Sequence, residues 1–236
     1  MTKRSYRNRG RKENIVISLA GAHGVGKTTL FNLLKKELQD NNKFKFYPER
    51  YVKNPPFPFG SHDKQIGFRS EIHFLQQFIR RNKSVKKFDN TYNGRIIILD
   101  RTPICVLVYS KALRLQKKDY ELICDTYKSV EWREDYVIYL TAEVHTIMKR
   151  ILQRGSLDKD RQEWNEHKQD YLLYTLTYYK KLLLSNPNVI ILDTDKLTQD
   201  DVLKHIKEII SQLTGFSFKK LEKLPATQKS ILNFLK

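Results

Sequence analysis

The feature that most constrains this chain is a glycine-rich run between an apolar stretch and a helix-forming stretch. Residues 21–28 read GAHGVGKT, which matches the pattern G-x-x-x-x-G-K-[ST] of a phosphate-binding loop. The preceding residues 15–20 (IVISLA) predict a buried strand, and residues 29–36 (TLFNLLKK) predict the start of a helix. The alternative is a glycine-rich turn that binds nothing, and the two flanking elements argue against it.

The chemistry of this loop is local. Glycines let the backbone curl so that successive N–H groups point inward, and the helix N-terminus adds its positive end. We expect Lys27 to reach the β- and γ-phosphates of a nucleotide and the Thr28 hydroxyl to bind Mg²⁺. The predicted nucleotide-binding residues are Gly21, Ala22, His23, Gly24, Val25, Gly26, Lys27, Thr28 and Thr29.

Length and charge set further bounds. The chain has 236 residues, which is enough for one domain with a sizeable core. Its net charge of +18 exceeds what binding a triphosphate requires. This excess favours a polyanionic partner or an anionic surface, and a lysine-rich, solvated surface is an equal alternative.

Cysteine use and hydrophobicity bear on the compartment. Cys105 and Cys124 are too few for a disulfide framework and fit a reducing environment. No run approaches the ~20 apolar residues of a membrane span, and the first residues contain no apolar secretion segment. We therefore expect a protein of the cytoplasm with no membrane contact, and a nuclear location is also open.

Strands and helices are predicted to alternate along the chain. Apolar runs at 43–47, 95–100, 136–140 and 189–192 predict four further strands. Amphipathic stretches predict helices at 63–82, 103–115, 118–130, 143–152, 162–185 and 199–213. Such alternation predicts an α/β domain with a parallel sheet and right-handed crossovers.

Two of these strands end in acidic residues. The strand at 43–47 carries Glu49 to the carboxyl edge of the sheet, where open α/β sheets bind ligands. The strand at 95–100 ends in Asp100, which is predicted to be a second Mg²⁺ carboxylate beside the phosphate loop. A helix-capping aspartate is the alternative, and the adjacent Arg101 favours the metal-binding hypothesis.

The helices carry further candidates. Gln76 and Gln77 lie amid apolar residues, where a buried amide can pair with a base edge, although either may equally be solvated. Arg150 and Arg154 share a helical face, and Arg161 is the last residue of a polar, charged break at 155–161. Three arginines near such a break predict a lid over the transferring phosphate, with a solvated helix end as the alternative.

Taken in order, these motifs resemble the deoxynucleoside kinase and thymidylate kinase group. The resemblance runs from Ile15 to about Leu213 and implies a P-loop NTPase-type fold: a five-stranded parallel sheet, helices on both faces and an Arg-rich lid. It also implies roles. Glu49 matches the carboxylate that accepts the proton of the sugar 5′-hydroxyl, Arg101 the arginine beside it, and Asp100 a metal-associated acid.

The resemblance assigns the remaining candidates too. Asp193 to Asp195 matches the loop against the donor adenine, so ATP and Mg²⁺ are the expected cofactors. Gln76 or Gln77 matches the base-reading glutamine. The lid arginines are matched by Arg150, Arg154 and Arg161, and the catalytic set becomes Glu49, Arg101, Lys27, Arg150 and Arg154. Arg50 stands where the group has proline and Thr102 where it has serine or tyrosine, which leaves the acceptor open.

Both ends of the chain lie outside this predicted kinase domain at 14–214. Residues 1–13 form a basic arm predicted to be disordered, which could touch nucleic acid or only aid solubility. The tail at 215–236 resembles a sliding-clamp docking motif, with an amphipathic helix folded onto its own body as the alternative. The motif residues are Gln228, Ile231, Phe234 and Leu235.

Two classes of function follow. The first is an ATP- and Mg²⁺-dependent phosphotransferase acting on a deoxynucleoside 5′-hydroxyl or on a nucleoside monophosphate such as dTMP, with a homodimer left open. The alternative is a nucleic-acid-associated P-loop ATPase, or a 5′-polynucleotide kinase, recruited through the sliding-clamp motif. A non-enzymatic nucleotide switch is disfavoured because a full set of transfer residues is present.

Overall fold

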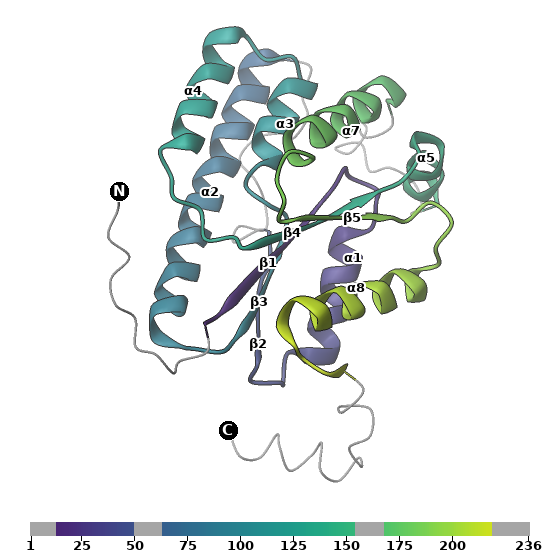
Figure 1. The fold of residues 1–236 in the computed structure, drawn as a ribbon. Coiled ribbons are helices and arrows are strands. Elements are labelled where there is room, and N and C mark those ends of the chain that lie inside the picture. Colours follow the sequence, from purple (N-terminus) through teal and green to yellow (C-terminus); the bar gives the residue numbers. More distant parts are fainter. Residues whose placement is uncertain (1–12, 50–62, 154–167, 219–236) are drawn as a thin grey trace.

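The computed structural model describes residues 13–49, 63–153 and 168–218 (Figure 1). Within these residues, strands and helices alternate as the sequence predicts. The described elements are β1 (Ile15–Ala20), α1 (Lys27–Leu38), β2 (Phe44–Tyr47), α2 (Lys64–Thr91), β3 (Ile96–Asp100), α3 (Cys105–Ala112), α4 (Lys117–Lys128), β4 (Tyr136–Thr141), α5 (Val144–Leu152), α7 (Gln169–Leu183), β5 (Val189–Asp193) and α8 (Gln199–Thr214).

The five strands form one parallel sheet in the order β2-β3-β1-β4-β5. Register brings three chain segments to the same edge. Leu19 at the end of β1 lies beside Asp100 at the end of β3, and Tyr47 of β2 lies beside Leu99. The glycine loop after β1, Glu49 after β2 and the turn after β3 therefore leave the sheet side by side.

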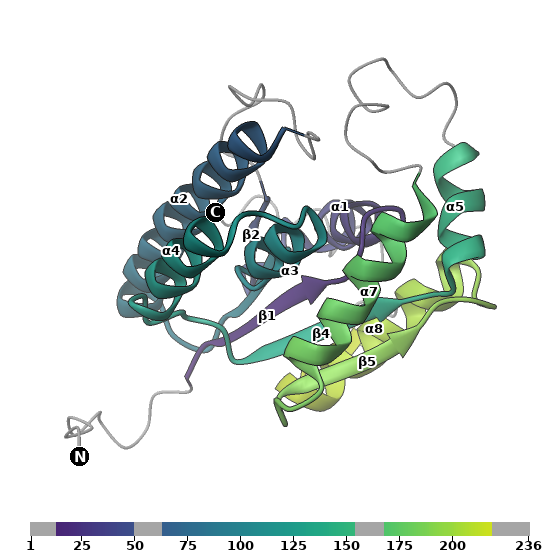
Figure 2. The ribbon, with the colours of Figure 1, turned by 90° about the horizontal axis from the view of Figure 1, so that it is seen from above.

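Helices cover both faces of the sheet, as the fold prediction requires. Figure 1 shows α1 and α8 on one face and α2, α3, α4 and α7 on the other. Figure 2 shows α3 and α7 running together over the sheet, where they pack against each other. Such double coverage explains why β1, β3 and β4 are nearly continuous apolar runs.

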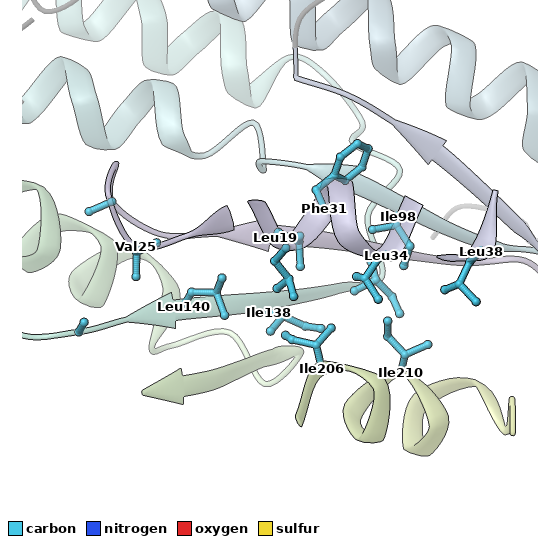
Figure 3. Packing of buried hydrophobic residues seen from close by; sticks show 14 of the residues in the cluster. Leu19, Val25, Phe31, Leu34, Leu38, Ile98, Ile138, Leu140, Ile206 and Ile210 are labelled. Carbon is cyan, nitrogen blue, oxygen red and sulfur yellow. The ribbon is translucent and has the colours of Figure 1, made fainter. Parts of the chain in front are cut away.

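The core on the α1 face is built from branched side chains (Figure 3). Leu19 and Ile138 of the sheet meet Leu34 of α1, together with Ile206 and Ile210 of α8. All five are at most 1% exposed. This packing fixes α1, and with it the start of the helix after the glycine loop, rigidly against the sheet.

One predicted helix boundary was wrong by a wide margin. The helix expected at 63–82 extends to Thr91 as α2, because its charged second half still contributes to packing. Val85 is buried in a small cluster with Val16 and Leu99, and Asp89 forms an ion pair with Arg133 at 2.9 Å. The helix predicted at 103–115 is shorter, Cys105–Ala112.

Several predictions fall outside the described residues. These are the basic arm up to residue 12, the beginning of the lid with Arg154 and Arg161, and the sliding-clamp motif from Gln228 to Leu235. The helix predicted from residue 162 is described from Gln169 onward. Among the described helices, none is long and apolar enough to cross a bilayer.

The glycine loop gives a stability test. Gly21 and Gly26 both have positive φ angles, 141° and 105°, but a Cβ on Gly21 would lie 2.4 Å from the Leu140 carbonyl oxygen. A Cβ on Gly26 would meet nothing within 4 Å. We expect Gly21→Ala to lower the free energy of unfolding by about 1–3 kcal/mol more than Gly26→Ala, because only the former adds a clash with the main chain of β4. Urea denaturation of both variants measures the difference, and equal losses would contradict this packing.

Candidate active site

The phosphate-binding loop joins β1 to α1 and leaves donors at the helix start. Helix α1 begins at Lys27, has no acidic residue in its first turn and has no side-chain cap on its N-terminus. Its first N–H groups are therefore available to an anion, and the helix dipole favours negative charge there. This arrangement is what a triphosphate requires.

Lys27 lies buried over the same loop. Its side chain is 4% exposed, and its Nζ donates to the Ala22 carbonyl at 2.7 Å. Burial lowers the pKa of Lys27 to about 7, and the nearby charge of Arg101 acts in the same direction. The lysine thus sits at the anion site with an ammonium group that lacks a close carboxylate partner among the described residues.

Asp100 and Thr28 form the second group of oxygen ligands. The Thr28 hydroxyl donates to Asp100 Oδ2 at 3.2 Å, while Oδ1 of Asp100 is buried with no hydrogen-bond partner among the described residues. Burial raises the pKa of Asp100. A cation would satisfy the unpaired oxygen, and a carboxylate beside a hydroxyl next to a triphosphate is a donor set that suits Mg²⁺. The residues present therefore fit the expected metal.

Glu49 and Arg101 form an ion pair at the edge of the sheet. Arg101 Nε lies 2.9 Å from Glu49 Oε1, and the two side chains are 19% and 9% exposed. Burial alone would lower the pKa of Arg101, but Glu49 and then Tyr109 outweigh it and hold that pKa well above its usual value. The guanidinium stays charged, so it holds a carboxylate in place beside the phosphate-binding loop.

The turn that carries Asp100 and Arg101 is unusual. Arg101 has a φ of 66°, in the left-handed region that non-glycine residues rarely adopt. Arg81 of α2, only 2% exposed, donates to the Asp100 carbonyl at 2.5 Å and to the Arg101 carbonyl at 2.7 Å. These two hydrogen bonds from α2 stabilise the turn. Arg81 was not predicted as a functional residue, although an arginine three residues after Phe78 in an apolar helical stripe indicates burial.

Thr102, the departure from the family pattern, also anchors this turn. Its hydroxyl donates to Glu134 Oε2 at 3.0 Å, and the residue is fully buried. Burial raises the pKa of Glu134. The threonine hydroxyl therefore points into the protein interior and fixes the residues that follow β3.

Arg150, one of the predicted lid arginines, bonds to the loop after β5. Its Nη1 donates to the Thr194 hydroxyl at 2.9 Å and its Nη2 to the Thr194 carbonyl at 2.6 Å. Asp195 Oδ1 accepts from the Glu143 N–H at 3.0 Å, while Asp193 is exposed. Arg150 and Asp195 thus tie α5 to the loop after β5, the loop that was matched to the donor adenine.

The two glutamines of α2 differ. Gln76 is exposed, and Gln77 is buried with its Oε1 lacking a hydrogen-bond partner among the described residues.

The loop residue His23 stacks between two tyrosines. Its ring centroid lies 6.0 Å from that of Tyr109 and 5.5 Å from that of Tyr171. His23 therefore packs against α3 and α7.

One acidic residue of α2 was not anticipated. Glu71 is 4% exposed, and the charges of Arg101 and Glu49 both act on its carboxyl. The sequence pattern does not reveal it, because a single glutamate in a charged helix resembles a solvated one. Its position one turn before the buried Leu75 was the sign that it faces inward.

Comparisons with known proteins agree with this geometry. Among curated proteins, the chain is 28% identical over 163 residues to "Deoxyadenosine/deoxycytidine kinase" of Bacillus subtilis, covering 65% of this chain and 73% of the relative. Among solved structures it is similar in fold to a deoxyadenosine kinase from M. mycoides with products bound (TM-score 0.68, 22% identity, 84% of this chain and 100% of that chain). A thymidylate kinase from Candida albicans is also similar (TM-score 0.64, 18% identity, 86% and 92% covered).

The family comparison covers nearly the whole body of the protein. A model of the family described as "Deoxynucleoside kinase" matches residues 17–216, from β1 to the end of α8. The predicted resemblance and the predicted parallel α/β fold are confirmed. The alternative of a nucleic-acid-associated ATPase or polynucleotide kinase finds no support among these relatives. The chain belongs to the deoxynucleoside kinase family and is a kinase that transfers phosphate to a nucleoside or nucleotide.

Proposed function

We propose that this kinase transfers the γ-phosphate of ATP to the 5′-hydroxyl of a deoxynucleoside. The observation that carries the proposal is the Glu49–Arg101 ion pair, placed by strand register beside the phosphate-binding loop. A carboxylate held at that point by an arginine can accept a hydroxyl proton. The name of the Bacillus subtilis relative, a deoxyadenosine/deoxycytidine kinase, supports a nucleoside acceptor.

The residues of the site account for each bond and proton in the transfer. Glu49 takes the proton of the 5′-hydroxyl, the freed oxygen forms a bond to the γ-phosphorus, and the bond from that phosphorus to the bridging oxygen of ADP breaks. Lys27 and the N-terminus of α1 hold the phosphates. Mg²⁺, held by Thr28 and Asp100, neutralises phosphate charge when it is bound. The protein contributes position and charge compensation, which is most of what phosphoryl transfer needs.

Charge favours a hydroxyl acceptor over a phosphate acceptor. Around the Glu49–Arg101 pair the described residues supply a second carboxyl group, Glu71, and two guanidinium groups that already have partners. Arg101 is paired with Glu49, and Arg81 donates to two main-chain carbonyls. A nucleoside monophosphate would bring two more negative charges to this position and would need additional cations. Arg154 and Arg161 stay predictions for the lid, and they would act on the transferring phosphate.

The base assignment is tested by Glu49→Gln. The amide keeps the shape but cannot accept the proton, so we expect kcat to fall by about 10²–10⁴-fold while ATP binding stays unchanged. Release of ADP is measured with deoxyadenosine, deoxycytidine, deoxyguanosine, thymidine, dTMP and a 5′-hydroxyl oligonucleotide. Glu121→Gln, an exposed change of the same kind on α4, is the control. Full activity of Glu49→Gln would remove the base, and transfer to dTMP alone would overturn the nucleoside acceptor.

Arg81 is expected to act on transfer as a positioning residue. Arg81→Met removes both hydrogen bonds beneath the Asp100–Arg101 turn, so Arg101 can leave its left-handed conformation and Glu49 loses its partner. We expect kcat to fall by about 10-fold or more with a smaller change in the KM for ATP, because the phosphate loop does not depend on these bonds. Arg80→Met changes the exposed neighbour on the same helix and controls for charge. A variant of Arg81 that loses stability but keeps wild-type kcat would leave only a structural role.

Lys27 gives a pH-dependent prediction. Its folded-state pKa of about 7 lies below the usual 10.5, so at about pH 8 the free protein holds this amine mostly neutral. Phosphate oxygens favour the ammonium form and raise the pKa, so ATP binding takes up a proton at pH 8. Calorimetry in buffers of different ionisation enthalpy should show an uptake approaching one proton at pH 8. Lys27→Arg, which is always charged, should show none. Equal uptake in both proteins would contradict the assignment.

A further inference from the structure

The side chain of His23 leaves the glycine loop between α3 and α7, two helices that run together over the sheet (Figure 2). Its ring lies 6.0 Å from the Tyr109 ring of α3 at an angle of 19°, and 5.5 Å from the Tyr171 ring of α7 at an angle of 20°. Three nearly parallel rings from three separate elements therefore form one stack. The transfer step does not use this side chain, although it belongs to the loop that holds the phosphates.

The stack continues to the acceptor side of the site. The guanidinium carbon of Arg101 lies 5.8 Å from the Tyr109 ring centroid, and Arg101 Nε lies 2.9 Å from Glu49 Oε1. The Tyr109 residue is 8% exposed, and the Tyr179 ring lies perpendicular to its ring at 6.2 Å, so Tyr109 has little freedom to tilt. A chain of contacts thus connects His23 with the catalytic pair.

The two residues that flank His23 are held by contacts of their own. Lys27 Nζ donates to the carbonyl of Ala22, the residue directly before His23, at 2.7 Å. Gly24, directly after it, has a φ of 80° and lies so close to α5 that a Cβ there would come within 2.8 Å of two isoleucine side chains. The main chain at His23 therefore lies between a hydrogen bond and a tight packing contact, and the direction of its ring depends on both.

Nucleotide binding acts on the first of these two contacts. Phosphate oxygens are charged acceptors, and they compete with the neutral Ala22 carbonyl for Lys27 Nζ. When Lys27 turns to the phosphates, Ala22 loses this hydrogen bond while Gly24 stays packed against α5. The main chain between Ala22 and Gly24 then has to adjust, and this segment carries His23. Donor binding thus changes a contact directly beside the residue at which the aromatic chain begins.

We propose that His23 is a positioning residue that couples donor binding to acceptor binding, with Tyr109 and Arg101 as the intermediate contacts. The inference rests on the proposed nucleoside kinase activity. A protein that has already ordered the loop, the stack and Arg101 around a nucleotide loses less conformational entropy when the acceptor binds. The donor therefore raises the affinity for the acceptor, and the acceptor raises the affinity for the donor by the same factor.

The flat ring of His23 is the feature that this coupling requires. Leucine at this position fills much of the same space but cannot stack between two parallel rings, whereas phenylalanine can. Both substitutions remove the imidazole nitrogens and any charge they carry. A difference between His23→Leu and His23→Phe therefore reports on ring stacking, separately from the polarity of the side chain.

The experiment measures the binding of deoxyadenosine, deoxycytidine, deoxyguanosine and thymidine to the full chain by calorimetry. Each is titrated with and without Mg²⁺ and a non-hydrolysable ATP analogue in which an NH group bridges the β- and γ-phosphates. In the wild type we expect the analogue to tighten binding of the preferred nucleoside by about 5-fold or more. His23→Leu should lose this factor, and His23→Phe should keep it. His205→Leu, which changes a half-exposed histidine of α8 on the opposite face of the sheet, is the control and should match the wild type (Figure 1).

Binding of the analogue alone provides the second readout. His23→Leu leaves Lys27 and the N-terminus of α1 in place, so it should bind the analogue as the wild type does when no acceptor is present. A residue that only holds the loop in shape would instead weaken this binding. A large loss of analogue binding in His23→Leu would therefore overturn the coupling role.

The outcomes separate this inference from the proposed function. The wild-type measurement needs no variant, so an acceptor affinity that the analogue leaves unchanged overturns the inference. A His23→Leu protein that keeps the wild-type factor also overturns it, and so does a His23→Phe protein that loses the factor. If the wild type binds no nucleoside and transfers phosphate to none, the proposed function fails. The same comparison with dTMP as the acceptor then decides the role of His23.

Discussion

The site depends on one turn at the carboxyl end of β3. Asp100 and Arg101 are adjacent, yet they serve different partners: Asp100 accepts from Thr28 on the phosphate side, and Arg101 pairs with Glu49 on the acceptor side. This division requires the left-handed conformation of Arg101, a conformation that costs energy without support. Arg81 supplies that support by bonding both carbonyls. The backbone conformation of this one turn thereby fixes the phosphate-side group and the Glu49–Arg101 pair relative to each other.

Three titratable groups of the site are buried, and burial disfavours the charged form of each. The pKa of Lys27 is lowered, and those of Asp100 and Glu71 are raised, each mainly by desolvation. Among the described residues none of the three forms an ion pair, although Lys27 donates to the Ala22 carbonyl and Asp100 accepts from Thr28. A triphosphate at Lys27 and a metal ion at Asp100 are partners that would compensate these charges. The site is thus shaped for ligands before they bind, and little reorganisation is left for the transfer step.

Sequence patterns predicted the parts of this site that follow strands. Parallel strands end at a common edge, so a glycine loop, Glu49 and Arg101 placed after three of them had to meet there. Residues inside α2 could not be placed in this way. Whether Gln76, Gln77 or Glu71 faces the site depends on the rotation of a helix whose charged half hides its inward stripe, and the sequence pattern ended that helix at Asn82 instead of Thr91.

Residues at strand ends and residues inside α2 have different roles in the site. Phosphoryl transfer needs fixed groups, and the strand ends supply them from the most rigid part of the protein, where every neighbouring strand is hydrogen-bonded. Choice of acceptor needs a surface that can change without disturbing those groups. Helix α2 contributes Arg81 to the turn, and its buried Glu71, ten residues earlier, lies within the electrostatic influence of the Glu49–Arg101 pair. Through its two bonds to the turn, Arg81 links the position of this helix to the transfer geometry at the end of β3.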